Sequence, residues 1–290
     1  MGGKPSKAVR YDGNPEAAST ASQISSTTPT VTIDGRVYHS DELSSYCLPR
    51  DEEEQDRLNS QHFALKALFG SNTLSYVQEN LTLEAKILDI GCGSGSWVME
   101  MAIDHPHAHV TGIDMADMFP TMIRPENVKF ELANVLNGIP YPDNTFDFVH
   151  MRLLIAAFRE HEWPLVIAEI FRVLKPNGLV QLMESDFTVQ RRQDPYIGSK
   201  LAKLLTNASF NIEMEDVRVL DYGDDENPVS REMLWNWKNA MHSLKPLLGH
   251  RVTQHPDQYD MVVDRFIQDC DRYHWYVKLW AYCGRKPNVA

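Results

Sequence analysis

The sequence lacks the marks of several large classes of protein. No apolar run approaches the roughly 18 residues that a membrane-spanning helix needs, and the N-terminus has no apolar signal core. Cysteine is scarce, and Cys47, Cys92, Cys270 and Cys283 are scattered without C-x-x-C spacing or a nearby histidine pattern for zinc. We therefore expect no transmembrane segment, no secretory signal and no metal. The cytoplasm is the expected compartment, with nuclear or membrane-associated placement as alternatives.

Basic residues are too few for a surface that binds nucleic acid. The 290-residue chain has 28 Lys and Arg against 40 Asp and Glu, a formal net charge of -12. Binding to phosphates needs clustered positive charge, and no basic patch with interleaved aromatics is present. A nucleic-acid partner is therefore not expected. Hydrophobic content of 43% suits a packed core, and the length allows one large α/β domain, alone or with a small cap.

Large apolar residues are also few in the first 30 positions, which are rich in Ser, Thr, Ala, Gly and Pro. Such a segment buries too little surface to offset its ordering entropy, so we expect a disordered tail and place its boundary at residue 35. Its first residues, Met1 to Ser6, fit the M-G-x-x-x-[ST] pattern for myristoylation of Gly2. Lys4, Lys7 and Arg10 would add a weak electrostatic second signal for membrane association. Chance occurrence of so short a motif is the alternative.

Beyond the tail, the pattern predicts a helical cap followed by alternating strands and helices. Residues 31–38 predict a hairpin around Asp34-Gly35, and Asp51 is the expected N-cap of a helix that ends at Gly70. From residue 85 the alternation of strand and helix is typical of a mainly parallel sheet. Expected strands cover 87–90, 109–114, 127–134, 145–150 and 178–184, with helices over 97–103 and 162–174 and a final antiparallel pair over 216–220 and 275–281. Residues 230–273 predict an inserted lid of two helices, broken near Pro246 and Pro256. The expected divisions are thus a tail (1–35), a cap (36–80), a core (81–187) and a segment that completes the sheet and carries the lid (188–290).

A cluster of glycines follows the first strand of this sheet. Gly91, Gly93 and Gly95 stand directly after Ile90 and before the expected helix, with Asp89 as the acid of the strand. Glycine tolerates positive φ and lets the backbone approach a ligand closely. The spacing is G-x-G-x-G, which differs from the G-x-G-x-x-G of dinucleotide-binding folds. A tight strand-to-helix turn without a ligand is the alternative.

Polar residues stand at the ends of the neighbouring strands, where open α/β sheets bind their ligands. Asp114 ends the second strand, and its carboxylate could accept both hydrogen bonds from a ribose diol. The alternative for Asp114 is a helix N-cap or loop acid. Asn134 and His150 end the third and fourth strands.

Two segments resemble the class I S-adenosylmethionine (SAM) methyltransferases. The turn from Asp89 to Gly95, which includes Cys92, resembles motif I of that family. Residues 128–149 (VKFELANVLNGIPYPDNTFDFV) resemble its pattern of a strand ending in Asp-Ala followed by L-P-[FY]-x-D-x-x-F-D. By that resemblance Asn134 would meet the adenine amino group, and Val135 would cover the ring. Asn134 replaces the usual Asp, so it could accept through its oxygen without the charge-assisted gain, and a simple turn residue is the alternative.

More specifically, the chain resembles the fungal LaeA-type methyltransferases, named for a regulator of secondary metabolism. The resemblance covers about residues 37 to 187 and rests on four motifs: Tyr46-x-Leu-Pro, Asp51-Glu-Glu-Glu-Gln-Asp-Arg-Leu, the glycine turn, and Phe146-Asp-Phe-Val-His-Met-Arg152. It implies SAM as cofactor and a Rossmann-like, seven-stranded, mainly parallel sheet with an antiparallel last strand, a helical N-terminal cap and a helical lid.

The resemblance also suggests which residues surround the cofactor. Met115 would be apolar cover, with ordinary core as the alternative. Tyr46, Arg57, Gln61 and His62 would close over the cofactor from the cap. The alternative is that Arg57 pairs with a neighbouring acid and His62 packs in the core. His150, Met151 and Arg152 would line the exit of the fourth strand, where the acceptor approaches.

The expected reaction is an in-line displacement at the sulfonium methyl group, helped mainly by positioning of donor and acceptor. His150, Glu184 and Asp186 are the candidate bases for an oxygen or nitrogen acceptor. The chain lacks an Asn-Pro-Pro-[Phe/Tyr] run, which disfavours amino methylation of adenine or glutamine. We expect a small-molecule or protein acceptor. A SAM-binding regulatory or scaffold protein without robust turnover is the main alternative, and a nucleotide-binding dehydrogenase is a third; the oligomeric state stays open.

Overall fold

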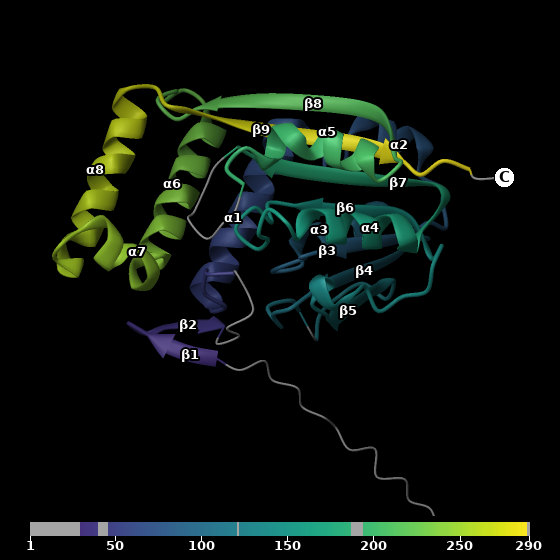
Figure 1. The fold of residues 1–290 in the computed structure, drawn as a ribbon, viewed down its shortest axis with the longest axis horizontal. Coiled ribbons are helices and arrows are strands. Elements are labelled where there is room, and N and C mark those ends of the chain that lie inside the picture. Colours follow the sequence, from purple (N-terminus) through teal and green to yellow (C-terminus); the bar gives the residue numbers. More distant parts are fainter. Residues whose placement is uncertain (1–29, 40–45, 121, 187–193, 289–290) are drawn as a thin grey trace, which may run out of the picture.

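The computed structural model describes residues 30–39, 46–120, 122–186 and 194–288. A seven-stranded sheet runs through the molecule in the order β5-β4-β3-β6-β7-β9-β8 (Figure 1). Its strands are β3 (Lys86–Ile90), β4 (His109–Asp114), β5 (Val128–Leu132), β6 (Phe146–Arg152), β7 (Leu174–Ser185), β8 (Asn211–Asp221) and β9 (Tyr276–Arg285). The pairs among β5, β4, β3, β6 and β7 are parallel, and β9 is antiparallel to both of its neighbours. The predicted Rossmann-like fold is therefore confirmed.

Helices cover both faces of the sheet. Along β3, Ile87 packs in the hydrophobic cluster that contains Trp97, whereas Leu88 and Ile90 pack in the cluster on the opposite face. Burial on both faces is why β3 reads as a nearly continuous apolar run. The covering helices are α3 (Ser96–Asp104), α4 (Trp163–Val173) and α5 (Ile197–Asn207), with the 3-10 turn η1 (Val135–Asn137) after β5. The helix α5 was not predicted.

The strand order reverses between β3 and β6, because β4 and β5 lie on one side of β3 and β6 and β7 lie on the other. A crevice at the carboxyl ends of β3 and β6 is the usual ligand site in such a sheet. The strand predicted over 178–184 begins earlier, because β7 starts at Leu174 directly after α4. Its register with β6 is irregular between Phe146 and Phe148.

The N-terminal cap consists of a hairpin and two helices. Strands β1 (Thr30–Ile33) and β2 (Arg36–His39) pair around Asp34 and Gly35, whose φ angles of 51° and 80° fit the predicted tight turn. This hairpin lies across the boundary expected at residue 35. Helix α1 (Glu52–Phe69) begins as predicted, because Asp51 accepts a hydrogen bond from the Glu54 N–H at 3.1 Å. Helix α2 (Ser75–Asn80) follows.

The lid lies between β8 and β9 and stands at the end of the molecule beyond α1 (Figure 1). It comprises α6 (Pro228–Ser243), α7 (Lys245–Val252), the 3-10 turn η2 (Pro256–Gln258) and α8 (Tyr259–Arg272). Two long helices were predicted, and the short α7 between them was not. The expected breaks do occur, since Pro246 stands in the first turn of α7 and Pro256 begins η2.

Three expectations fall partly or wholly outside the described residues. The tail expected over residues 1–35 lies mostly before residue 30, as does all of the myristoylation motif at Gly2. The boundary expected at residue 187 lies between described segments. Within the described part of the chain, every helix is too short or too polar to cross a membrane.

Candidate functional site

The glycine turn connects β3 to α3 with three residues in the left-handed region. Gly91, Gly93 and Gly95 have φ angles of 68°, 54° and 79°. The backbone N–H groups of Gly91 and Cys92 both donate to the Ile113 carbonyl, at 2.9 and 3.1 Å, which fixes the turn against β4. At Gly95 a Cβ atom would lie 2.6 Å from Phe130 Cζ, so any side chain there would displace β5 or the turn. The G-x-G-x-G spacing is therefore required by the local structure.

Asp114 lies at the tip of β4 beside this turn. Its Oδ2 accepts from the Gly93 N–H and its Oδ1 from the Ala116 N–H, both at 2.8 Å. Each carboxylate oxygen can accept a further hydrogen bond, so the side chain can receive two hydroxyl groups. Burial raises the pKa of Asp114 above its usual value, although these N–H groups oppose the shift. A donor-rich ligand such as a ribose diol would stabilise the charged form.

Asp114 lines a cavity at this edge of the sheet. The same cavity is lined by Met115, Asn134 and Val135. Asn134 Oδ1 accepts from the Leu136 N–H at 3.0 Å and caps η1. The structure thus gives this oxygen the turn role that was the alternative. A carbonyl oxygen has two lone pairs, so Asn134 can still accept from a ligand amine.

His150 is buried beneath the site instead of lining it. Its ring stacks on Trp97 with 4.0 Å between centroids, and Nδ1 lies 2.7 Å from Asp89 Oδ1. Burial lowers the pKa of His150, so the ring is neutral and donates from Nδ1 to the carboxylate. Met151 is 1% exposed and packs in the cluster on the opposite face of the sheet. Among the described residues, Asp89 lines the cavity. Gly95, His150 and Met151 do not.

The other two candidate bases differ in position. Glu184 is 1% exposed and does not line the cavity; its Oε1 accepts from the Leu154 N–H at 2.6 Å. Burial raises the pKa of Glu184 to about 8, so the side chain is protonated at neutral pH. Asp186 does line the cavity, and its oxygens accept from Trp280 Nε1 at 2.8 Å and from the Ser199 N–H at 3.1 Å. Asp186 is thus the candidate base that faces the cavity.

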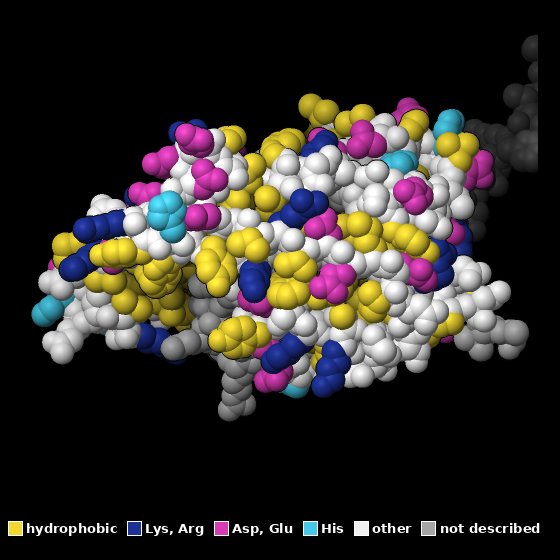
Figure 2. Space-filling view, turned by 90° about the horizontal axis from the view of Figure 1, so that it is seen from above, with side chains coloured by type: hydrophobic (Ala, Val, Ile, Leu, Met, Phe, Trp, Pro, Cys, Tyr) yellow, Lys and Arg dark blue, Asp and Glu magenta, His cyan; other side chains and the backbone are white. Residues whose placement is uncertain are grey.

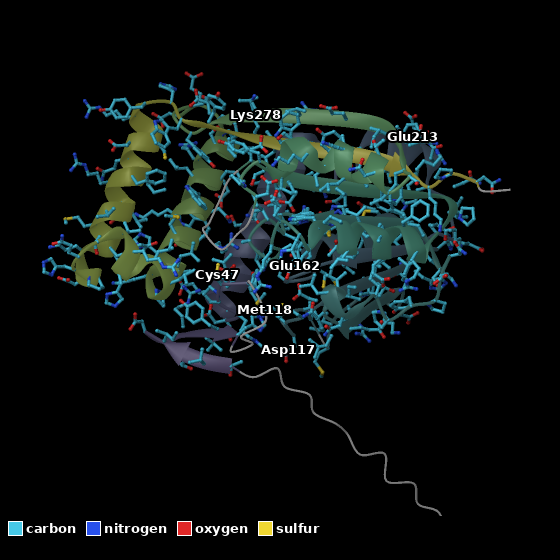
Figure 3. All side chains as sticks on the ribbon, in the orientation of Figure 1. Cys47, Asp117, Met118, Glu162, Glu213 and Lys278 are labelled. Carbon is cyan, nitrogen blue, oxygen red and sulfur yellow. The ribbon has the colours of Figure 1, made fainter. Side chains whose placement is uncertain are left out.

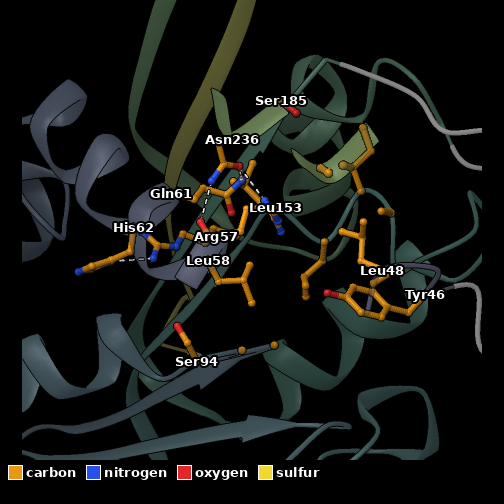
Figure 4. Close-up of a pocket in the computed structure, with 18 of the residues that line it drawn as sticks. Tyr46, Leu48, Arg57, Leu58, Gln61, His62, Ser94, Leu153, Ser185 and Asn236 are labelled. Atoms are coloured by element: carbon orange, nitrogen blue, oxygen red, sulfur yellow. Dashed lines mark hydrogen bonds between the residues drawn. The ribbon is translucent and has the colours of Figure 1, made fainter. Parts of the chain in front are cut away.

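The cap and the lid meet above the glycine turn. Arg57 binds Glu54 with two hydrogen bonds of 2.9 and 2.6 Å and donates to Asn236 Oδ1 at 2.7 Å, while Asn236 Nδ2 donates to the Arg57 carbonyl at 2.7 Å. Gln61 also donates to Asn236, at 3.1 Å, and Figure 4 shows both cap side chains directed toward it. Arg57 therefore lines the cavity with its charge already paired, as the alternative for this residue proposed.

Two further cap residues, Tyr46 and Cys47, line the cavity from its other side, and burial raises the pKa of Tyr46 well above the usual value. Met118 lines it too, at the place where the cap faces the sheet edge (Figure 3). The cap is held there because Gln55 donates to the Met118 carbonyl at 3.0 Å.

His62 connects the cavity to a surface ion pair. Its Nδ1 lies 2.8 Å from Nη2 of Arg152, and its Nε2 lies 2.7 Å from Glu100 Oε2. Glu100 in turn accepts from Lys66 at 2.8 Å. Burial and the neighbouring Arg152 lower the pKa of His62 to about 4. His62 and Arg152 both line the cavity.

The lining residues named above surround one cavity of about 370 Å³, which extends from the sheet edge into the lid. Its lid end was missed from the sequence and is mostly aromatic and aliphatic: Tyr222, Met233, Trp237, Leu244, Phe266, Cys270 and Trp275 are among its residues. Figure 2 shows apolar side chains gathered around a hollow at this end of the molecule. Aromatic residues within the predicted lid were the available signal, but their period could not say which ones faced inward.

Comparison with known proteins agrees with this geometry. Residues 87–178, from β3 to the first part of β7, match the family described as Methyltransferase domain. The secondary metabolism regulator laeA of Coprinopsis cinerea is 35% identical over 159 residues, 53% of this chain and 39% of that protein. The protein-methionine methyltransferase laeA of Emericella nidulans is 32% identical over 155 residues, 53% of this chain and 40% of that protein. The chain thus matches only about two fifths of the length of these curated relatives.

A solved structure supports the fold. The [4+2]-cyclase SpnF superimposes with a TM-score of 0.51 at 17% identity, over 81% of this chain and 96% of that one. Sheet order, glycine turn and family match together define a class I SAM-dependent methyltransferase fold. Over about half of its length the chain is also similar to the laeA proteins. The residues present fit SAM, because the cavity combines a glycine-rich turn with the two acceptor oxygens of Asp114.

Proposed function

We propose that this chain binds SAM in the cavity and transfers its methyl group to an acceptor that enters from the lid end. The observation that carries the proposal is Asp114, which lines the cavity while it is fixed by the Gly93 and Ala116 N–H groups. When bound, SAM supplies a methyl group made electrophilic by the sulfonium. The chain contributes position: the glycine turn and Asp114 hold the donor, and the roof of α1 and α6 limits the access of water. Such positioning can supply roughly 7–11 kcal/mol of the barrier.

The apolar lid end indicates what kind of group the acceptor presents. Tyr222, Trp237, Phe266 and Trp275 offer rings and no formal charge. We propose an acceptor, a small molecule or a protein segment, that inserts an apolar group here. The name of the Emericella nidulans relative adds a specific candidate, the thioether of a protein methionine. A thioether needs no base, whereas a hydroxyl or ammonium acceptor would need one, and Asp186 is placed for that role.

Titration of the purified chain with S-adenosylhomocysteine (SAH) tests the first part of the proposal. We expect saturable binding, weakened roughly tenfold or more in Asp114→Asn, because the amide loses the charge and one acceptor oxygen. Asp104→Asn, which changes an exposed acid on α3, is the matched control and should bind like the wild type. Equal affinity in all three proteins would contradict the assignment of Asp114.

A second candidate function is a SAM-binding regulator that acts through partners without robust turnover. The positions of His150 and Glu184 outside the cavity favour it, because only Asp186 remains of the three candidate bases. Incubation with methyl-labelled SAM and fungal extract, or methionine-containing peptides, separates the two. Labelled product supports the enzyme; SAH binding without product in any fraction supports the regulator.

We also propose cytoplasmic placement, with weak membrane association if Gly2 carries a myristoyl group. The proposal rests on the motif from Met1 to Ser6 alone. The mass of the mature N-terminus after expression in a eukaryotic host tests it, and an unmodified Gly2 would rule out the acyl anchor.

A further inference from the structure

Two arginines, Arg57 and Arg152, line the cavity, and they differ in whether a carboxylate contacts the guanidinium. Arg57 is paired with Glu54 at 2.6 Å. Arg152 forms no ion pair with any carboxylate among the described residues, and its hydrogen bond there is the one from Nη2 to His62 at 2.8 Å. Arg152 therefore brings a positive charge to the cavity wall that the surrounding protein does not neutralise by contact.

The partner of Arg152 is itself uncharged. A guanidinium can only donate, so His62 Nδ1 accepts, and the ring proton is on Nε2. That proton is donated to Glu100, which is also bound by Lys66 at 2.8 Å and by Asn72 at 3.1 Å. The low pKa of His62, about 4, agrees with a neutral ring at physiological pH. His62 thus orients the guanidinium and leaves its charge in place.

The acids nearest to Arg152 are engaged elsewhere. Asp89 is bonded to His150, and Glu100 to Lys66 and His62. Both favour the charged form of Arg152 at a distance, yet burial is the larger effect and lowers the pKa of Arg152 below its usual value. A partly buried cation without a contacting anion is costly, and an anionic ligand would relieve that cost.

The place of Arg152 in the sheet indicates which anion. Asp89 pairs with His150 and Ile90 with Met151, so Arg152 comes level with Gly91 at the start of the glycine turn. Alternation along β6 puts Arg152 on the α1 side, opposite to Met151. Asp114 lies at the tip of β4, two strands away, which is roughly 10 Å at the usual strand spacing. A ligand whose ribose binds Asp114 and whose tail crosses the glycine turn would bring that tail to Arg152.

We propose that Arg152, oriented by neutral His62, binds the carboxylate of the amino-acid end of SAM. The inference rests on the proposed function, since it assigns one end of the same cofactor. An arginine fork suits a carboxylate because two parallel N–H groups match its two oxygens. Nη2 carries two N–H bonds, so it can donate one to His62 and the other, parallel to an N–H of Nη1, to the carboxylate. His62 is a positioning residue in this arrangement.

Calorimetric titration with two ligands tests the proposal: SAH, and its decarboxylated analogue, which lacks only the carboxylate. The wild type should bind SAH more tightly than the analogue. Arg152→Met should weaken SAH roughly 10- to 100-fold and change the affinity for the analogue less than about threefold. Arg152→Lys, which keeps the charge and loses the fork, should fall between the two. Arg218→Met, on β8 beside Asp216, is the matched control and should leave both affinities unchanged.

Several results would overturn the inference. One is wild-type protein that binds the two ligands equally well, a comparison that does not depend on any variant folding. Another is an Arg152→Met protein that loses affinity for both ligands equally, or for neither. Unchanged SAH binding with a raised KM for an acceptor would assign Arg152 to the acceptor instead. Failure of the wild type to bind either ligand would refute the proposed function itself, which is a distinguishable outcome.

Discussion

Burial of Glu184 makes a quantitative prediction about stability and pH. Its carboxyl group is 1% exposed, Oε1 accepts from the Leu154 N–H, and Oε2 has no hydrogen-bond partner among the described residues. Desolvation therefore outweighs the backbone donors and raises the pKa of Glu184 from 4.5 to about 8. The substitution Glu184→Gln keeps the shape and the accepting oxygen, and it removes the titration.

The sign follows from proton linkage. A raised pKa in the folded state gives stability that is fully present below pH 4.5 and is lost as the pH rises to about 8. At about 1.4 kcal/mol for each pH unit, Glu184 costs the wild type roughly 3 kcal/mol of unfolding free energy between pH 4.5 and pH 7. The free energy of unfolding of Glu184→Gln relative to that of the wild type should therefore be greater at pH 7 and above than at pH 5.

Urea denaturation of both proteins at intervals from pH 5 to pH 8 measures the difference. Subtracting one curve of unfolding free energy against pH from the other cancels the contribution of every other titrating group, provided that the slopes with urea agree. Glu84→Gln, at an exposed site before β3, is the control and should follow the wild type. Parallel curves for Glu184→Gln and wild type would refute the reasoning. Loss of methyl transfer in a stable Glu184→Gln protein would show that this side chain acts in the chemistry.

Two further predictions concern the turn and the cavity wall. Gly95→Val should lower the unfolding free energy by roughly 1–3 kcal/mol in thermal or urea denaturation, because its Cβ would meet Phe130 and the φ of 79° is strained for a branched residue; wild-type stability would refute this. Asp186→Asn should slow labelled methyl transfer to hydroxyl or amine acceptors by roughly 10²-fold or more while leaving transfer to a thioether within about threefold. Equal effects on both acceptor types would remove Asp186 as a base.

The sheet and the glycine turn were predictable because their signals are local. Three glycines at alternate positions after a buried strand fit few structures besides a turn with repeated positive φ, and Gly91, Gly93 and Gly95 all have it. Asp114 could be assigned to the site from the sequence as well, because it ends the strand next to the glycine turn. Helix α5 was missed, although Asp194 and Pro195 stand directly before it and Asp194 Oδ1 accepts from the Tyr196 N–H at 3.0 Å, a turn signal at its start.

The orientation of side chains at strand ends was harder to predict. His150 and Glu184 both stand near the carboxyl ends of their strands, as expected for residues of a site. Whether such a side chain enters the cavity depends on what covers that face. Trp97 stacks on His150, and the Leu154 N–H donates to the carboxyl group of Glu184. These are contacts between residues 30 or more positions apart, and neither periodicity nor motif spacing records them.

The division of the cavity into a floor and a roof follows from where each part comes in the chain. The floor is made of strand ends and the glycine turn, where backbone N–H groups and short polar side chains such as Asp114 are presented. The roof comes from α1 and the lid, and the reciprocal hydrogen bonds of Arg57 and Asn236 join these two segments, which are 179 residues apart. A cation donor held on the floor would therefore present its methyl group toward a surface that limits the access of water. Specificity for the acceptor then depends on the lid, so related chains with the same floor could methylate different acceptors by changing α6 and α8 alone.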